Sequence, residues 1–293
     1  MIKEIEAKTI LSTVKNGPDK YFGMSYNMNL YRGCQHGCIY CDSRSSCYGI
    51  ENFSDILIKK NAVELLHKEL KGKRTIGTIG TGSMNDPYMP IEKELGVTRR
   101  ALETISIYKF PIHIITKGDL ITRDIDIIKE IGKTYAAASI TITTGDDKLS
   151  SIIEPFAPVS SKRFEAIKKL SKEGIYTGII LMPVLPFLTD SLKNIDDIVK
   201  RGKDAGAKYI IAWFGMTLRE GQREYYFKEL DKSFSGLKER YVHNYKGLYS
   251  CSVPEHEKLY SAFKELCYKE AIARKMNFYE KNSVQLSLFD SYI

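Results

Sequence analysis

Short apolar runs alternate with helical patterns along most of this chain, and this order limits the folds that it can adopt. Between residues 27 and 215 the order strand–helix repeats about six times. The predicted strands are residues 27–31, 75–80, 111–116, 134–143, 175–182 and 207–214. They are apolar throughout, which is typical of a parallel sheet covered by helices on both faces. The sequence therefore predicts an α/β fold, either a partial (β/α)6 barrel or an open doubly wound sheet.

Helical patterns separate these strands and continue beyond them. Those between the strands cover residues 60–70, 98–108, 124–131, 160–173 and 191–205, and Thr98 is the expected N-cap of the second. After Gly215 the chain becomes rich in charged residues and tyrosine, and helices are predicted at 220–240 and 254–275. We therefore expect four parts, which are an N-terminal segment (1–26), the barrel (27–215), a helical C-terminal extension (216–280) and a tail (281–293).

Three of the six cysteines, Cys34, Cys38 and Cys41, lie within eight residues. Three thiolates so close together can hold three corners of an iron–sulfur cluster or three positions around a zinc ion. A closed zinc site needs a fourth ligand, which His36 or Cys47 can supply. A cluster with three protein ligands instead leaves one iron open, where the amino and carboxylate groups of S-adenosylmethionine can bind. The spacing alone leaves both metal centres open.

The charge and the N-terminal residues fit a cytoplasmic protein with an anionic partner. The formal net charge is +8, which favours nucleic acid, although scattered lysines are as common in mildly basic enzymes. The first residues are charged, and no apolar run approaches the roughly 20 residues of a membrane-spanning helix. We therefore expect a cytoplasmic protein without a membrane segment, whose clustered cysteines bind metal rather than form disulfides.

Several motifs together resemble a known family. The spacing C-x3-C-x2-C, with the aromatic Tyr40 before the last cysteine, resembles the signature of radical S-adenosylmethionine enzymes. Residues 30–34, 80–88, 116–124 and 153–155 are similar to the spore photoproduct lyase group of DNA repair enzymes, and the resemblance covers roughly residues 8–215. It implies a partial (β/α)6 barrel of the TIM type with a cluster at the carboxyl ends of the strands, where parallel α/β folds place their ligands.

The resemblance also implies roles for individual residues. The three clustered cysteines would hold a [4Fe–4S] cluster, and Tyr40 would lie near the adenine of S-adenosylmethionine. Lys117, just past a strand end, would meet the methionyl carboxylate unless it is an ordinary loop lysine. Glu154 would contact the cofactor or serve as a structural cap. An external electron donor such as flavodoxin or ferredoxin is implied too. The residues assigned to the cofactor pocket are Tyr40, Ser83, Asn85, Asp86, Lys117 and Glu154.

The implied activity is that of a lyase-type enzyme acting on a nucleobase in DNA. It would abstract hydrogen, rearrange or cleave a C–C bond, and then return a hydrogen to a base that is flipped or unpaired. Ser83 stands where the family carries its donor cysteine, and a serine O–H bond is too strong to yield hydrogen readily. The candidate donors are therefore Cys251 and Cys47, with Tyr249 as an alternative relay.

Two other functions stay open at this point. One is radical modification of RNA, a peptide or a small molecule, and the other is a non-enzymatic zinc-loop module tethered to a sliding clamp. The clamp is expected as a partner because five residues of the tail resemble the pentapeptide by which bacterial DNA polymerases and repair proteins bind the clamp. The alternative is a tail that folds back on its own domain. The five residues are Gln285, Leu286, Ser287, Leu288 and Phe289.

Overall fold

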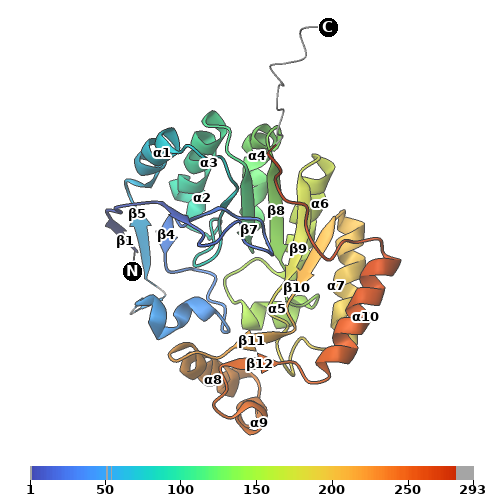
Figure 1. Ribbon diagram of the computed structural model, residues 1–293. Helices are drawn as coiled ribbons and strands as arrows, with labels where there is room; N and C mark the ends of the chain where they lie inside the picture. Colours follow the sequence, from blue (N-terminus) through green and yellow to red (C-terminus); the bar gives the residue numbers. More distant parts are fainter. Residues whose placement is uncertain (1, 51, 54, 282–293) are drawn as a thin grey trace.

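A computed structural model describes residues 2–281 of the chain, except 51 and 54. Its main sheet has seven strands in the order β10-β9-β8-β7-β6-β3-β2 (Figure 1). All neighbours from β3 to β10 pair in parallel, and β2 is antiparallel to β3. The predicted parallel α/β sheet is confirmed, as a partial barrel. Its strands are β2 (Leu11–Thr13), β3 (Tyr26–Met28), β6 (Ile79–Gly80), β7 (Ile112–Thr116), β8 (Ala136–Thr141), β9 (Tyr176–Leu181) and β10 (Tyr209–Ala212).

Helices cover the outer face of this sheet (Figure 1). Every residue of β8 is buried, which explains why its sequence is apolar throughout rather than alternating. The covering helices are α1 (Ala62–Gly72), α3 (Val97–Ile107), α4 (Ile125–Gly132), α6 (Ser160–Lys172), α7 (Leu192–Ala205) and α10 (His256–Lys269). Two shorter ones, α2 (Glu92–Leu95) and α5 (Asp147–Ile153), lie in the connections after β6 and β8.

Two local predictions were wrong. The strand predicted at 75–80 is reduced to Ile79–Gly80, because residues 75–78 run as irregular chain before the sheet. Thr98 is not an N-cap, since α3 begins at Val97 after Gly96. The Thr98 hydroxyl instead donates to the carbonyl oxygen of Pro87 at 2.6 Å, and this bond ties α3 to the turn after β6.

The predicted strand 27–31 is split between two sheets. Its first part is β3, and its end forms β4 (Tyr31–Arg32) in a small sheet with β1 (Ile2–Ile5) and β5 (Ile56–Lys59). The cysteine loop follows β4 and leads into two short 3₁₀ helices, η1 (Asp42–Arg44) and η2 (Ser46–Tyr48). The cysteine loop is therefore held between the small sheet and the barrel.

The C-terminal extension builds a second layer next to the end of β10. Its helices α8 (Gln222–Ser233) and α9 (Leu237–Tyr245) lie beside a two-stranded sheet of β11 (Gly215–Thr217) and β12 (Ser250–Ser252), as Figure 1 shows. The single helix predicted over 220–240 is thus two helices. Residues 250–252 form a strand in which Cys251 pairs with Met216.

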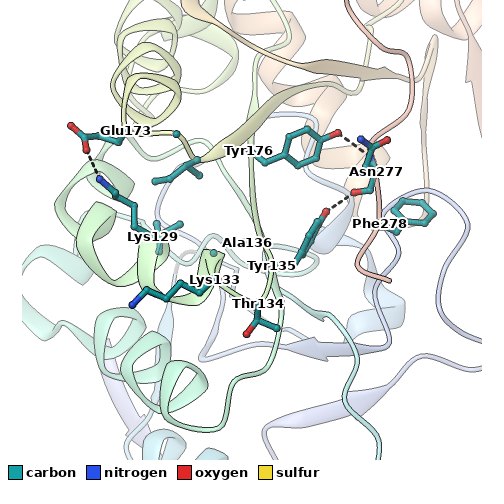
Figure 2. Close-up of a pocket in the computed structure, with 13 residues that line it drawn as sticks. Lys129, Lys133, Thr134, Tyr135, Ala136, Glu173, Tyr176, Asn277 and Phe278 are labelled. Atoms are coloured by element: carbon teal, nitrogen blue, oxygen red, sulfur yellow. Dashed lines mark hydrogen bonds and ion pairs between the residues drawn. The ribbon is translucent and has the colours of Figure 1, made fainter. Parts of the chain in front are cut away.

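After α10 the chain returns to the barrel at the amino ends of β8 and β9. There the Tyr135 hydroxyl donates to the Asn277 carbonyl oxygen at 2.6 Å, and the Asn277 amide donates to the Tyr176 hydroxyl at 2.9 Å (Figure 2). Phe278 packs on Gly23, where a Cβ would approach its ring to 2.6 Å. These contacts line a pocket of about 600 Å³ at the end of the barrel remote from the cysteine loop.

Across residues 2–281, apart from the two that are not described, no helix has the length and apolar character needed to span a lipid bilayer.

Candidate active site

A pocket of about 300 Å³ lies at the carboxyl ends of the barrel strands. The cysteine loop forms one wall, with all three clustered cysteines in the lining. Chain segments that directly follow or end the strands form the others. They include Ser83 and Asp86 after β6, Lys117 after β7, Thr141 in β8, Met182 after β9 and Trp213 after β10. The alternation of strands and helices thus brings residues from the whole barrel to one edge, as parallel sheets do.

The three cysteines are free thiols in different degrees of burial. Cys38 is buried, whereas Cys34 and Cys41 are partly exposed toward the pocket. Burial raises the pKa of the Cys34 and Cys38 thiols, and neighbouring acidic groups raise it further. A bound cationic metal centre would lower these pKa values and hold the sulfurs as thiolates. In the described part of the chain, no three His, Cys, Asp or Glu side chains lie close enough together to hold a single metal ion between them.

The cysteine loop is shaped by its own contacts with the protein. Gly33 has a φ of 83°, and a Cβ there would clash with the carbonyl oxygen of Asp55. The Ile39 amide donates to the Ile153 carbonyl oxygen at 2.9 Å, and the Phe156 amide donates to the His36 carbonyl oxygen at 3.1 Å. The loop is therefore bound on one side to β5 and on the other to the turn after α5.

Asp86 anchors the loop from inside the barrel. Its carboxylate accepts from the Thr116 hydroxyl at 2.5 Å and from the Lys117 amide at 2.7 Å, and it lies 3.2 Å from Nε2 of His36. Burial acts to raise the pKa of Asp86, but His36 and these donors lower it well below its usual range. Asn85 acts similarly, because its side-chain amide donates to the Tyr31 carbonyl oxygen at 2.8 Å. Both residues line the pocket, with their polar groups engaged in the protein.

Beneath the loop lies a buried charge cluster around Glu154. The Glu154 carboxylate accepts from the Tyr40 hydroxyl and, at 3.1 Å, from the Thr143 hydroxyl, and Nη2 of Arg163 is 2.5 Å away. Burial acts to raise the pKa of Glu154, but Arg163 and Lys117 outweigh burial and lower it. Arg163 lies near the start of α6, and nothing in the local sequence pairs it with Glu154. The structure buries it completely.

Lys117 supplies a positive charge on the pocket wall. Its Nζ lies 5.6 Å from the centre of the Tyr40 ring, and among the described residues no hydrogen bond or ion pair of this ammonium is found. Burial opposes its charge, yet Cys38 and Glu154 raise the pKa of Lys117 above its ordinary value. Because Glu154 is already paired with Arg163, Lys117 is left with charge to offer to an anionic ligand.

The three candidate hydrogen donors lie outside the lining of this pocket. Cys251 is fully buried in β12, packed with the tyrosines of α8 and α9. Cys47 and Tyr249 come together in a separate pocket of about 490 Å³, where Arg219 lies between them. The Arg219 guanidinium donates to the Cys47 sulfur at 3.3 Å and sits 5.1 Å from the Tyr249 ring. Ser83 does line the main pocket, and its hydroxyl is bonded to Asn27.

A barrel with a three-cysteine loop and an unpaired lysine at the carboxyl ends of its strands defines a class of cofactor-dependent enzymes. The model of the Radical SAM superfamily matches residues 28–200 of this chain, and the chain belongs to that superfamily. Membership implies a [4Fe–4S] cluster and S-adenosylmethionine, in place of the zinc ion that the spacing had left open.

The chain is also similar to individual relatives and to solved structures. An uncharacterized protein of Methanocaldococcus jannaschii is 34% identical over 194 residues, which are 65% of this chain and 72% of that protein. A Pseudomonas phage M6 protein named radical SAM Nalpha-GlyT isomerase is 26% identical over 181 residues, 62% of this chain and 37% of that protein. Spore photoproduct lyase complexed with dinucleoside spore photoproduct superposes with a TM-score of 0.67 at 13% identity, over 92% of this chain and 79% of that one. This last likeness shows the fold.

Proposed function

We propose that this protein is a radical S-adenosylmethionine enzyme that acts on a damaged or modified nucleobase in DNA, with C–C bond cleavage in a photoproduct as the first candidate reaction. The observation that supports it most is one pocket that combines the three-cysteine loop with the unpaired Lys117 ammonium. The fold shared with spore photoproduct lyase and the net charge of +8 favour DNA as the substrate.

The residues present fit the two cofactors that the family implies. Cys34, Cys38 and Cys41 would hold the cluster, because all three thiols line the same pocket. When bound, the cluster and S-adenosylmethionine supply a 5′-deoxyadenosyl radical, which abstracts hydrogen from the substrate. Lys117 would bind the carboxylate of the methionine moiety as a charge-assisted partner. The Tyr40 ring next to Lys117 would contact the adenosyl part.

The remaining predicted pocket residues would act by positioning. Asp86 and Asn85 fix the turn after β6 to the cysteine loop, so they would hold the two walls of the cofactor site together. Glu154 would keep Tyr40 in place and add negative charge near Lys117. Ser83, exposed at the pocket, would face the substrate.

A second candidate reaction is isomerisation of the base. Its support is that the pocket lining includes no thiol besides the three cluster cysteines, so within the described residues no donor cysteine faces the substrate. An isomerisation takes up and returns the same hydrogen and needs no separate donor. The relative named as a radical SAM isomerase points the same way. The two reactions differ in the product after digestion to nucleosides, because a lyase separates two joined bases into two monomers, whereas an isomerase gives one rearranged base of unchanged mass.

Two protein partners belong to the proposal. An external one-electron donor such as flavodoxin or ferredoxin would reduce the cluster. A bacterial sliding clamp would bind Gln285, Leu286, Ser287, Leu288 and Phe289, which lie outside the described residues. The clamp motif fits an enzyme that works on DNA.

Anaerobic turnover tests the proposed function. The reconstituted protein is incubated with S-adenosylmethionine, a reductant and a DNA oligonucleotide that has been irradiated with ultraviolet light. We expect 5′-deoxyadenosine to form together with a new base product, both measured by mass spectrometry. Unirradiated DNA, RNA of the same sequence and no nucleic acid serve as comparisons, and the Cys38→Ala variant is the negative control. Equal cofactor cleavage with RNA or without nucleic acid contradicts the choice of DNA.

A further inference from the structure

Trp213 is the single tryptophan of the chain and lines the pocket that also contains the three clustered cysteines. It directly follows β10, at the opposite end of the parallel strand order from β3 and the cysteine loop. Its side chain is 37% exposed, which is costly for so large an apolar ring unless something covers it. The neighbouring Phe214 is only 2% exposed and packs on Phe263 of α10. Phe214 therefore fills the core, whereas Trp213 is left open toward the pocket.

The backbone of Trp213 is fixed although its ring is free. Its amide donates to the Leu181 carbonyl oxygen at 3.1 Å, and its carbonyl oxygen accepts from the Val184 amide at 2.9 Å. In the described part of the chain its indole makes no hydrogen bond and no ring contact. Because the backbone is held, only the two side-chain torsions of Trp213 are ordered when a ligand covers the ring, so stacking costs little conformational entropy.

The surroundings of the ring fit a flat heterocycle. Met182, which is half-buried, lines the same pocket, and a methionine side chain offers polarizable contacts to a ring face. Hydroxyl groups of Ser83 and Thr217 lie in the same lining, and Ser83 is bonded to the Asn27 amide at 2.7 Å. The Thr217 hydroxyl donates to Asp42 at 2.6 Å, so the exposed Ser83 hydroxyl is the polar group that can meet a ring edge. Proteins bind extruded nucleobases by combining an aromatic face with polar groups at the ring edge.

We propose that Trp213 is the stacking platform for the substrate base and determines which bases enter the pocket. The inference rests on the proposed function in taking a nucleobase as the substrate class. Trp213 thus acts as a specificity-determining residue, because a planar unsaturated or extruded base stacks on the indole and a sugar or peptide chain does not.

Fluorescence provides a direct test, since Trp213 alone carries the indole signal. The full-length reconstituted protein, with S-adenosylmethionine bound and without reductant, is titrated anaerobically with an irradiated thymine-containing oligonucleotide. An abasic oligonucleotide of the same length is the matched ligand control. We expect saturable quenching with the first and not with the second. Quenching that is complete with S-adenosylmethionine alone overturns the proposal, because Trp213 would then stack on the cofactor.

Variants give a second readout by fluorescence anisotropy of a labelled irradiated oligonucleotide. Trp213→Ala should weaken binding about tenfold or more, since base stacking contributes about 1–3 kcal/mol per base, and Trp213→Phe should retain most of the affinity. Tyr268→Ala is the matched control, because Tyr268 is an exposed aromatic residue on the outer helix α10. Iron content and circular dichroism confirm that each variant is folded and loaded.

The outcomes separate the two proposals. Unchanged affinity of folded Trp213→Ala, with DNA still turned over, overturns the role of Trp213 alone. If an RNA oligonucleotide quenches the Trp213 fluorescence and no DNA oligonucleotide does, the result supports base stacking on Trp213 and overturns DNA as the substrate.

Discussion

At the scale of single residues, the pair Arg163–Glu154 is the most consequential buried interaction near the site. Both side chains are fully buried, and removal of one leaves an unpaired charge. We expect Arg163→Ala to lower the free energy of unfolding by about 3–5 kcal/mol, as measured by chemical denaturation. Lys162→Ala is the matched control, because Lys162 is adjacent and pairs with Glu165 in solvent. A loss no larger than that of Lys162→Ala contradicts a structural role for the pair.

His113 makes the stability of the protein depend on pH. It is fully buried in β7, where its Nε2 lies 2.7 Å from the Ser139 hydroxyl, and burial lowers its pKa from 6.5 to about 4. Between these values the unfolded chain binds the proton more readily than the folded one. The stabilisation is therefore complete above about pH 6.5 and is lost as the pH falls toward 4, by up to about 3 kcal/mol.

The matched variant for this pH effect is His113→Gln, which retains a polar side chain but does not titrate. Chemical denaturation of both proteins at pH 7.5, 6 and 5 isolates the contribution of His113 from that of the carboxylates. We expect the difference in stability between the two proteins to shrink on acidification. A constant difference across this range means that His113 is charged, or equally accessible, in the folded state.

At the scale of residues, sequence spacing was enough to predict which side chains gather at one pocket, whereas their roles toward a cofactor stay predictions. Cys34, Cys38 and Cys41 do face one pocket, and Lys117 joins them because it directly follows a strand. The role of Arg163 was not predictable, since its partner Glu154 is brought to it by the fold of the turn after α5 and not by helical spacing. The position of Cys251 was missed for a similar reason, because its strand forms only by pairing with β11.

At the scale of elements, the long apolar runs predicted their strands well, because burial on both faces requires an apolar sequence. The short strands β4, β6, β11 and β12 were missed or misjudged, since they depend on partners far away in the chain.

The segment that follows α10 also takes its position from strands far away in the chain. Residues 273–278 contact β10 and the starts of β8 and β9, so the described chain ends at the barrel end remote from the cysteine loop.

This arrangement leads to a prediction for the tail. A protein without residues 285–289 should lose binding to the bacterial sliding clamp, because the motif supplies the apolar contacts that enter a groove. Cofactor cleavage should stay unchanged, since the tail follows a part of the chain remote from the pocket. Surface plasmon resonance on immobilised clamp measures the first effect and 5′-deoxyadenosine release the second. A variant with Leu286 and Phe289 replaced by alanine tests the motif without truncation, and equal affinity in both variants would exclude it.

At the scale of the whole molecule, the barrel and the cysteine loop are held together by protein contacts alone. Hydrogen bonds from Ile39 and Phe156 bind the loop to the turn after α5, and Asp86 joins it to β7 beside His36. The main hydrophobic core runs through the sheet and its covering helices, whereas Cys38 packs in a second cluster with Ile153 and the C-terminal layer. Because these contacts come from the chain itself, we expect the barrel to fold before any cofactor binds, unlike a small zinc domain whose folding depends on its metal.

The Cys38→Ala variant tests this independence together with the metal assignment. We expect it to lose cluster iron and cofactor cleavage, because one of the three thiolates is absent. Its midpoint of chemical denaturation should nevertheless shift little from that of the cluster-free natural protein, since the alanine preserves the buried position of a small apolar group. Iron and sulfide analysis, absorbance spectroscopy and denaturation give the three readouts. Collapse of the folded state in Cys38→Ala would show that the thiol packing or the metal holds the barrel together, and retained cofactor cleavage would refute the ligand assignment.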